Sequence, residues 1–311
     1  SLDLVGRASA GPTPSSRLYA LLNSALYDAW ALFDAKAIPS LSQSPAKLAI
    51  TQLLNQAPAP SLTATAAIAP ASQPTVPLQP LPLRQAVMAV AASNVLQDVG
   101  PSLFKTGVLP LDLVAAIEVQ RQQALDALNL GGSTVSPLAE VALTLGTQVS
   151  DAIHAAALLD GSNQQNAYAD TSGYQPSIEL PSPGQIPKSW QPLPGQVALT
   201  PHWGNVKPFA VGKELVPNSI LTPYIGGVLN PAFVAEMNQV LQLSMHLTPQ
   251  QKAIADFWED GSGTSYPPGT WIGFTNDLIR DRNLGLDQAV KLSFTVGQAV
   301  FDAGIATRAP P

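Results

Sequence analysis

Residues 15–34 read SSRLYALLNSALYDAWALFD. Apolar side chains recur in this stretch at intervals of three and four, at Leu18, Leu21, Leu22, Ala25, Leu26, Ala29 and Phe33. Positions three and four apart share one face of an α-helix, so the spacing predicts a helix with an apolar stripe that ends around Asp34. The Gly-Pro-Thr-Pro sequence at residues 11–14 precedes it, as is typical of a helix start.

The same periodicity returns along the rest of the chain and predicts a mainly α protein. Helices are expected at residues 83–99, 111–128, 137–159, 231–246, 249–258, 268–282 and 286–306, with a short helical piece at 46–55. Thr248 before Pro249 is a capping signal for one of them. Alternation typical of strands is scarce, so we expect one helical domain over residues 1–311, a bundle of about eight helices with little or no β structure.

Two long stretches are predicted to be loops. Residues 57–82 hold seven prolines and seven alanines, which favours a surface loop of extended, polyproline-like character. Residues 162–223 are rich in Pro, Gly and Asn, and we expect this loop to wrap the helices in ordered form. Its expected aromatic anchors are Tyr168, Tyr174, Trp190, Trp203, Phe209 and Tyr224.

Composition excludes several functions. A net charge of −6 and a pI near 4.9 argue against nucleic acid as a partner, and the absence of cysteine excludes thiolate catalysis and Cys-ligated metals. No apolar run approaches the roughly 20 residues that span a bilayer. The start, Ser1-Leu2-Asp3-Leu4, has neither an initiator Met nor a signal-peptide pattern, which is compatible with a processed N-terminus of an exported bacterial protein.

The titratable residues offer weak candidates for chemistry. His154, His202 and His246 have no histidine or carboxylate three or four positions later, so a metal site built from them would need partners brought by tertiary structure. We interpret them as structural, and the His202-Trp203 pair as a loop anchor in preference to a substrate-contacting corner.

The acidic pair Glu259-Asp260 before Gly261-Ser262-Gly263-Thr264 is not a phosphate loop, because no Gly-Lys-Ser/Thr follows and no strand precedes it. We interpret the segment as a helix end that leads into a loop. A Gly-x-Ser-x-Gly nucleophile elbow is also missing. The sequence therefore assigns no catalytic, cofactor-binding or metal-binding residue.

Longer strings nevertheless resemble the helical front part of bacterial vanadium-dependent haloperoxidases, which belong with the type 2 phosphatidic-acid-phosphatase superfamily. In chain order they are residues 11–17 (GPTPSSR), 25–30 (ALYDAW), 160–163 (DGSN), 168–176 (YADTSGYQP), 190–193 (WQPL), 199–209 (LTPHWGNVKPF), 257–258 (FW), 267–271 (PPGTW) and 302–306 (DAGIA). The strings are collinear over nearly the whole chain, and only residues 57–82 have no counterpart. The resemblance implies a helical scaffold and, in a second C-terminal bundle, a vanadate cofactor that oxidises halide with peroxide.

The vanadate signatures of that family are missing from this chain. They are a Lys with an Arg-Pro seven positions later, a Ser-Gly-His, and an Arg six positions before the vanadium-binding His. Here no Arg precedes a Pro, the two Ser-Gly pairs continue into Tyr174 and Thr264, and no Arg stands six positions before a His. Vanadate needs a cluster of cationic and hydroxyl donors, so we expect the cofactor site to lie in a second bundle and not in these residues.

We therefore expect a scaffold half of a haloperoxidase-like protein that is not catalytically complete by itself. Its expected partner is a second copy or the C-terminal catalytic half, bound through apolar helical surface. Two alternatives stay open: a superfamily member that acts as an acid phosphatase, and a non-enzymatic helical binding or structural protein that uses the loop at residues 162–223.

Overall fold

The computed structural model describes residues 1–8, 10–41, 81–128, 137–176, 190–210, 224–225 and 228–307. In these residues the α-helices are α1 (Leu2–Arg7), α2 (Pro12–Ala31), α4 (Leu81–Val99), α5 (Leu111–Asp126), α6 (Pro137–Leu158), α7 (Pro231–Met245), α8 (Pro249–Phe257), α9 (Tyr266–Asp281) and α10 (Leu286–Ala306). Three 3-10 turns, η1 (Gly100–Leu103), η2 (Gln164–Asn166) and η3 (Pro201–Asn205), lie between them. The only strands there are β1 (Tyr224–Ile225) and β2 (Val228–Leu229), an antiparallel pair.

The mainly α class predicted from periodicity is confirmed, and most helices lie within a few residues of their predicted bounds. The predicted cap of α8 is also present: the Thr248 hydroxyl accepts a hydrogen bond from the Gln251 amide, and Oε1 of Gln251 accepts one from the Thr248 amide. The expected helical piece at 46–55 lies outside the described residues, as does the predicted loop at 57–82 up to residue 80.

One helix was missed, and some boundaries differ from the predictions: α2 spans Pro12–Ala31 and so begins and ends about three residues earlier than expected. The short helix α1 was not predicted, because six residues are too few to show periodicity; it is held by burial of Leu4 and Val5 and by contact with α9. Helix α4 begins at Leu81, two residues early, so Pro82 belongs to the helix and not to the loop. Proline is tolerated there because amides of the first turn need no helical acceptor.

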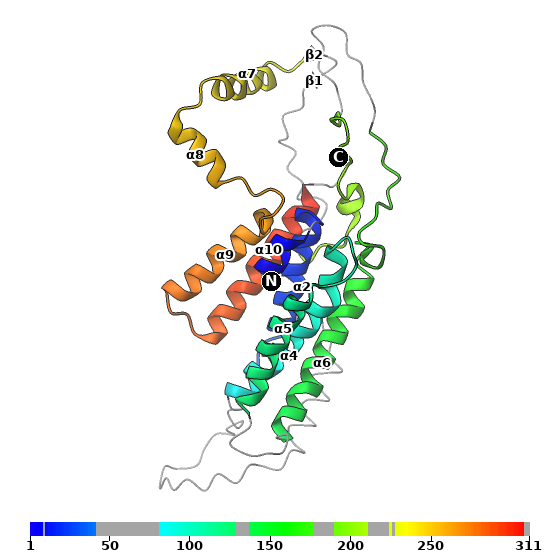
Figure 1. Cartoon of the computed structure of the whole chain (residues 1–311), viewed down its shortest axis with the longest axis vertical. Coiled ribbons are helices and arrows are strands. Elements are labelled where there is room, and N and C mark those ends of the chain that lie inside the picture. The colour runs from blue at the N-terminus through cyan, green and yellow to red at the C-terminus, as the bar shows by residue number, and fades with distance from the viewer. Residues whose placement is uncertain are drawn as a thin grey trace.

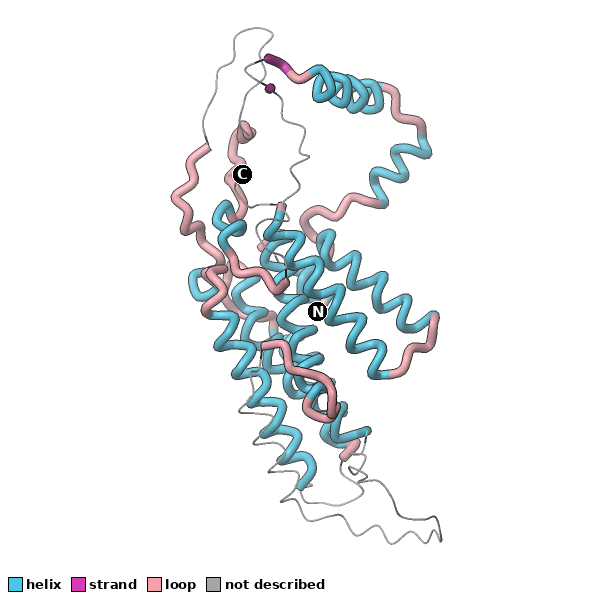
Figure 2. Tube along the Cα trace, turned by 180° about the vertical axis from the view of Figure 1, so that it is seen from behind, coloured by secondary structure: helices cyan, strands magenta, loops and turns pink. Residues whose placement is uncertain are grey.

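Helix α2 is the centre of the bundle. It packs against α4, α6, α9 and α10, which surround it in Figures 1 and 2. The single apolar stripe predicted for it was too narrow, since 16 of its 20 residues are buried, including the polar Ser15, Arg17 and Asp28. A helix enclosed on all sides must place polar groups inside the protein, and each of them then needs a partner.

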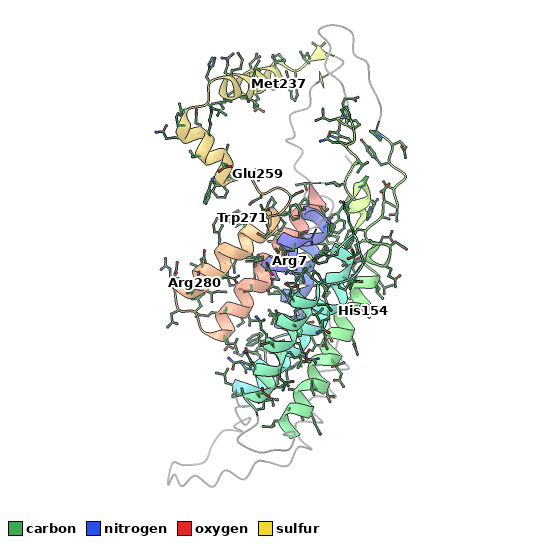
Figure 3. All side chains as sticks on the ribbon, in the orientation of Figure 1. Arg7, His154, Met237, Glu259, Trp271 and Arg280 are labelled. Atoms are coloured by element: carbon green, nitrogen blue, oxygen red, sulfur yellow. The ribbon has the colours of Figure 1, made fainter. Side chains whose placement is uncertain are left out.

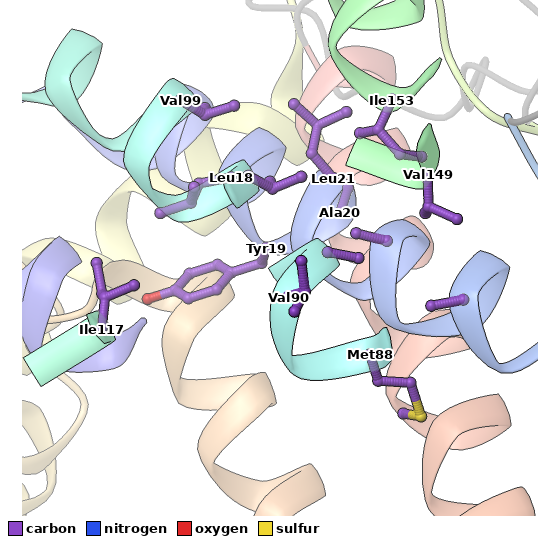
Figure 4. Packing of buried hydrophobic residues seen from close by; sticks show 14 of the residues in the cluster. Leu18, Tyr19, Ala20, Leu21, Met88, Val90, Val99, Ile117, Val149 and Ile153 are labelled. Carbon is purple, nitrogen blue, oxygen red and sulfur yellow. The ribbon is translucent and has the colours of Figure 1, made fainter. Parts of the chain in front are cut away.

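The apolar core lies where α2 meets α4 and α6. Leu18 and Leu21 of α2 lie near Val90 of α4 and near Val149 and Ile153 of α6 (Figure 4). All five side chains are almost fully buried. Full burial of one such aliphatic side chain is worth about 1.5–3 kcal/mol, so this junction provides the main apolar stabilisation of the bundle.

Small residues let the helices approach closely. A Cβ atom added to Gly146 of α6 would lie 2.5 Å from Cβ of Val90, and one added to Gly297 of α10 would lie 2.9 Å from Nδ2 of Asn23. Both distances are shorter than real side chains tolerate, so glycine is required at these two helix crossings.

Helices α7 and α8 differ from the rest, because none of their residues is buried. Figure 1 shows them as an arm that leaves the bundle between the β1–β2 hairpin and α9, and Figure 2 shows the same from behind. Capping by Asn230 and Thr248 fixes their first turns. Their apolar side chains are left without cover from the described bundle.

A separate finding concerns membranes. Among the described helices, none combines the length and the apolarity that crossing a bilayer would demand.

The α4–α6 contact gives a stability prediction. Gly146→Ala should cost about 1–3 kcal/mol of unfolding free energy, because its methyl group would overlap Val90 and the Val87 carbonyl. Gly273→Ala, in α9 with nothing within 4 Å of the new methyl group, should be neutral or stabilise by up to about 1 kcal/mol. Urea denaturation of both variants measures the difference, and equal effects would disprove the close approach.

Candidate functional site

The most densely connected polar group in the described chain is Arg17, which is fully buried in the centre of the bundle. Its Nε donates to Asp160 at 2.6 Å, one terminal nitrogen donates to Gln164 at 2.7 Å, and the other donates to the Ala157 carbonyl at 2.8 Å. The guanidinium also lies over the ring of Tyr168, 5.8 Å from its centre. Arg17 therefore joins α2 to the end of α6 and to the turn after it.

The turn that receives Arg17 has an unusual backbone. Asn163, Ala167 and Tyr168 all have positive φ, at 60°, 48° and 60°. Such left-handed residues each cost of the order of 1 kcal/mol unless they are glycine, so the surrounding contacts must compensate. Asp160 contributes to this, since its other carboxylate oxygen accepts a hydrogen bond from the Ser162 amide at 2.8 Å.

Tyr168 closes the network from the other side. Its hydroxyl lies 2.9 Å from the hydroxyl of Ser102 in η1, and its ring packs 5.9 Å from that of Trp203 in η3. Burial raises the pKa of Tyr168 above its usual value, because the phenolate would lose its hydration there. The phenol is therefore held in the neutral form, as a hydrogen-bonding group.

His202 and Trp203 anchor η3 beneath this turn. Both are almost completely buried. His202 Nε2 donates to the Ser162 carbonyl at 3.2 Å, while its Nδ1 lies 3.4 Å from Asp170 without the alignment of a hydrogen bond. This matches the interpretation of the pair as a loop anchor.

Of the other expected anchors, Tyr168 is buried, whereas Phe209 is 41% exposed and packs edge-on against Phe294 with only part of its ring surface. Tyr174 and Trp190 are 39% and 45% exposed, so the prediction that they anchor the loop was wrong. They line a surface hollow instead. The side chain of Tyr224 lies outside the described residues.

Segments far apart in the sequence meet around this region. The Thr13 and Thr200 hydroxyls lie 2.7 Å apart, and the amides of Phe209 and Ala210 donate to the Asp302 carboxylate at 2.7 and 2.8 Å. The start of α2, the turn after α6, η3 and the end of α10 are thus tied together. Four of the strings that carry the family resemblance are in direct contact here.

His154 lies elsewhere, on the outer face of α6 (Figure 3). Its Nδ1 contacts the carboxylate of Asp98 on α4, a partner that tertiary structure brings and that no spacing in the sequence could reveal. Both groups border a hollow of about 440 Å³ that Asp151 also lines. Within the described residues, however, no three His, Asp or Glu side chains are grouped closely enough to hold a metal ion.

The remaining sequence candidates have structural surroundings. His246 is exposed at the end of α7. Asp260 accepts a hydrogen bond from Thr270 in the first turn of α9 at 2.9 Å, and Thr264 accepts one from the Tyr266 amide at 3.0 Å. The segment at 258–264 is therefore the loop between α8 and α9, as the sequence indicated.

A surface hollow lies over the segments at 172–174 and 190–205. It has a volume of about 950 Å³ and includes Ser172, Tyr174, Trp190, Gln196, Leu199 and Asn205 in its lining. None of the described residues that line it is charged. We call it the Tyr174–Trp190 groove.

The described residues do not fit a vanadate site. Five arginines form ion pairs, each on a different helix: Arg7 with Asp112, Arg17 with Asp160, Arg84 with Asp287, Arg121 with Glu118 and Arg280 with Asp277. The described residues that line four of the hollows include a single Lys or Arg, namely Lys207. A trianionic oxyanion needs several cations at one place, so we derive no step through this cofactor.

A second surface feature is a cluster of exposed aromatic rings at the α8–α9 corner. Its members, Phe257, Trp258, Trp271 and Phe274, are 72%, 56%, 59% and 41% exposed. Their rings nevertheless contact one another: the ring centres are 5.2 Å apart for Phe257 and Trp258, 6.2 Å for Trp258 and Phe274, and 5.9 Å for Trp271 and Phe274. Trp271 is labelled in Figure 3 where α9 meets the arm. Further apolar side chains are exposed on the arm, among them Val240, Leu241 and Met245 of α7 and Ile254 of α8. We call these residues together the α7–α9 apolar surface.

Comparison with known proteins adds no relative. The chain matches no protein-family model, and no similar protein is found among curated sequences or solved structures. The haloperoxidase resemblance therefore stays a prediction that rests on the sequence strings.

Arg17 belongs to the string at residues 11–17 that resembles the family, but the sequence alone predicted no role for it. An arginine on a predicted helix surface is normally solvated, and only the burial of α2 on all sides makes its partners necessary. The one available signal was its position inside the apolar stretch at residues 15–34.

Arg17→Met should destabilise the fold by about 3–5 kcal/mol, because Asp160 and Gln164 would lose a buried charged partner. Arg7→Met is the matched control, since Arg7 also pairs with an aspartate at 2.6 Å but at an exposed position, and it should change stability little. Urea denaturation followed by circular dichroism compares them. A small effect for Arg17→Met would contradict the central role of this group.

Alkaline pH should weaken the fold through Tyr168. Its folded pKa is raised above the usual tyrosine value of about 10, so its contribution is constant below that pH and is lost as the pH rises towards the folded pKa. Stability measured from pH 8 to 11 should fall less steeply for Tyr168→Phe than for the unmodified protein. Burial also raises the pKa of Tyr19 and Tyr27, so these residues contribute to the pH dependence of both proteins. The contribution of Tyr168 is therefore the difference between the stability–pH curve of the unmodified protein and that of Tyr168→Phe.

Proposed function

We propose that this chain is the scaffold half of a vanadium-dependent haloperoxidase-like protein, and that a second helical bundle carrying the vanadate site docks on it. The parent reaction would be peroxide-dependent oxidation of halide. In this role the described helices supply a docking surface and a rigid support, and they contribute no catalytic group.

The observation that carries the proposal is the α7–α9 apolar surface. Two helices with no buried residue expose Met237, Val240, Leu241 and Met245, and four aromatic rings are exposed at the α8–α9 corner. Exposed apolar side chains in such number on a folded protein are typical of an interaction site, because their contact with water is unfavourable. Aromatic side chains are also the residues that dominate binding energy at interfaces.

The contacts around Arg17 give independent support. The strings that resemble the family include Arg17, Asp160, Thr200 and Asp302, which bind one another or their neighbours inside the protein. Residues of this kind maintain a scaffold and do not meet a substrate. That is the role which the resemblance implies for them.

The non-enzymatic alternative has an observation of its own. The Tyr174–Trp190 groove lies in the loop that was expected to be the contact surface of a binding protein, and two exposed aromatic residues line it. An acid-phosphatase role has no such support, since it would need the same cationic cluster as vanadate.

The proposal predicts the outcome of a binding and activity experiment. The chain alone, with vanadate, bromide and peroxide, should not brominate a phenol dye, and vanadium NMR should detect no stoichiometric binding. The C-terminal bundle of a bacterial vanadium haloperoxidase, co-expressed as a separate chain, should copurify with it. Trp258→Ser with Trp271→Ser should reduce that association at least tenfold, because both rings are central to the exposed surface.

Leu111→Ser is the matched control, since Leu111 is 85% exposed but lies on α5, away from this surface. It should leave the association unchanged. Dye bromination by the chain alone, stoichiometric vanadate binding, or association that is indifferent to the two tryptophans would each overturn the proposal.

A further inference from the structure

Another hollow lies where α6 and α10 both pack against α2. Its volume is about 440 Å³, within the range of about 300–1,000 Å³ that is usual for small-molecule sites. Helix α2 contributes Ser24 to the lining and α10 contributes Gln298, while loop residues at 40–41 and 207–209 form part of its border. We call it the Ser24–Gln298 hollow.

Buried carboxylates hold both loop segments in place. Asp28 accepts hydrogen bonds from the amides of residues 40–41, and Asp302 accepts them from the amides of residues 209–210. Asp28 and Asp302 are 0% and 3% exposed. A buried carboxylate that lost these donors would be strongly destabilised, so the loops cannot readily move into the hollow. The hollow is therefore a preformed feature of the fold.

The floor of the hollow has hydrogen-bonding groups that are not used. Gln298 and Ser24 are 7% and 1% exposed, and Gln298 Nε2 donates to the Ala20 carbonyl at 3.1 Å and to the Ser24 hydroxyl at 2.8 Å. In the part of the chain that the structure describes, Gln298 Oε1 accepts no hydrogen bond, and Ser24 Oγ donates none. Ser40 Oγ, which is also buried, has no partner either.

These free groups match a ligand hydroxyl. Polar atoms buried without partners are unfavourable, and a ligand that supplies the partners is bound more tightly for that reason. The floor offers an acceptor in Gln298 and a donor in Ser24, and a hydroxyl group can both donate and accept.

The mouth of the hollow is positively charged on one side. Lys207 is exposed, and its ammonium group forms no ion pair with any described carboxylate. Asp160 also lines the hollow, but its charge is compensated by the ion pair with Arg17. Apolar side chains, including those of Leu21 and Phe301, lie among the polar ones. This arrangement suits a molecule with an apolar body and an anionic group at one end.

We infer that the Ser24–Gln298 hollow binds a small amphiphilic anion, a medium-chain carboxylate with a terminal hydroxyl group. The hydroxyl donates to Gln298 Oε1 and accepts from Ser24, the chain packs on Leu21 and Phe301, and the carboxylate pairs with Lys207. The inference uses neither the α7–α9 apolar surface nor vanadate, so it is independent of the proposed function.

The test compares three compounds that differ only at their ends: ω-hydroxyoctanoate, octanoate and octanediol. A ligand-observed NMR titration with the full chain measures their affinities. The first compound should bind at least about fivefold more tightly than the other two, because octanoate leaves the floor groups without partners and octanediol lacks the charge that Lys207 attracts.

Variants assign each end of the ligand to its residue. Lys207→Met should abolish the preference for ω-hydroxyoctanoate over octanediol, and Ser24→Ala should reduce its preference over octanoate. Lys105→Met is the matched control, since Lys105 is also exposed but lies after η1 and outside the lining. Trp271→Ser, on the α7–α9 apolar surface, should also leave binding unchanged. Circular dichroism checks that each variant keeps its helices.

Three results would overturn the inference. One is equal affinity for the three compounds, which would indicate apolar adsorption. Another is a preference for the carboxylate that persists in Lys207→Met or is lost in Lys105→Met. The third is loss of binding in Trp271→Ser, which would place the ligand on the α7–α9 apolar surface.

Discussion

A single buried guanidinium constrains the architecture of this protein. Arg17 lies on the helix that all other parts of the bundle enclose, and water cannot reach it. An unpaired buried charge would cost several kcal/mol, so the last turn of α6 supplies the Ala157 carbonyl and the chain after α6 places Asp160 and Gln164 around the guanidinium. The left-handed residues of that turn follow from this requirement, because a regular helix would point these groups elsewhere.

This constraint separates a fixed part of the molecule from an open part. Through Tyr168, Trp203 and Asp302 the network extends from η1 to η3 and the end of α10, so the loops near Arg17 are held by the core. Helices α7 and α8 have no comparable connection and bury none of their residues. Two features are therefore available for partners: the exposed apolar side chains on the arm and α9, and the groove beside η3, whose described lining residues carry no charge.

The helices were largely predictable, whereas their surroundings were not. Glycine and proline mark helix ends locally, and the Thr248–Gln251 capping box of α8 is read from four consecutive residues. The periodicity of the sequence predicted only that α2 has an apolar face. Ser15 and Asp28 are buried because four helices from later in the sequence pack around α2, and the sequence of α2 does not show this. The same reasoning explains the wrong expectation for Tyr174 and Trp190, because an aromatic residue in a loop can equally pack inward or line a groove.

The sequence by itself determined the helical class, the approximate positions of the longer helices and the absence of cysteine chemistry, because these properties depend on composition and on neighbouring residues. The tertiary structure alone decided that Arg17 is buried, that Asp98 meets His154, and that Trp190 borders a groove. Each of these joins residues more than 50 positions apart or depends on how segments fold over one another. Local sequence patterns do not predict such contacts, because burial and electrostatic interactions depend on which residues pack nearby in space.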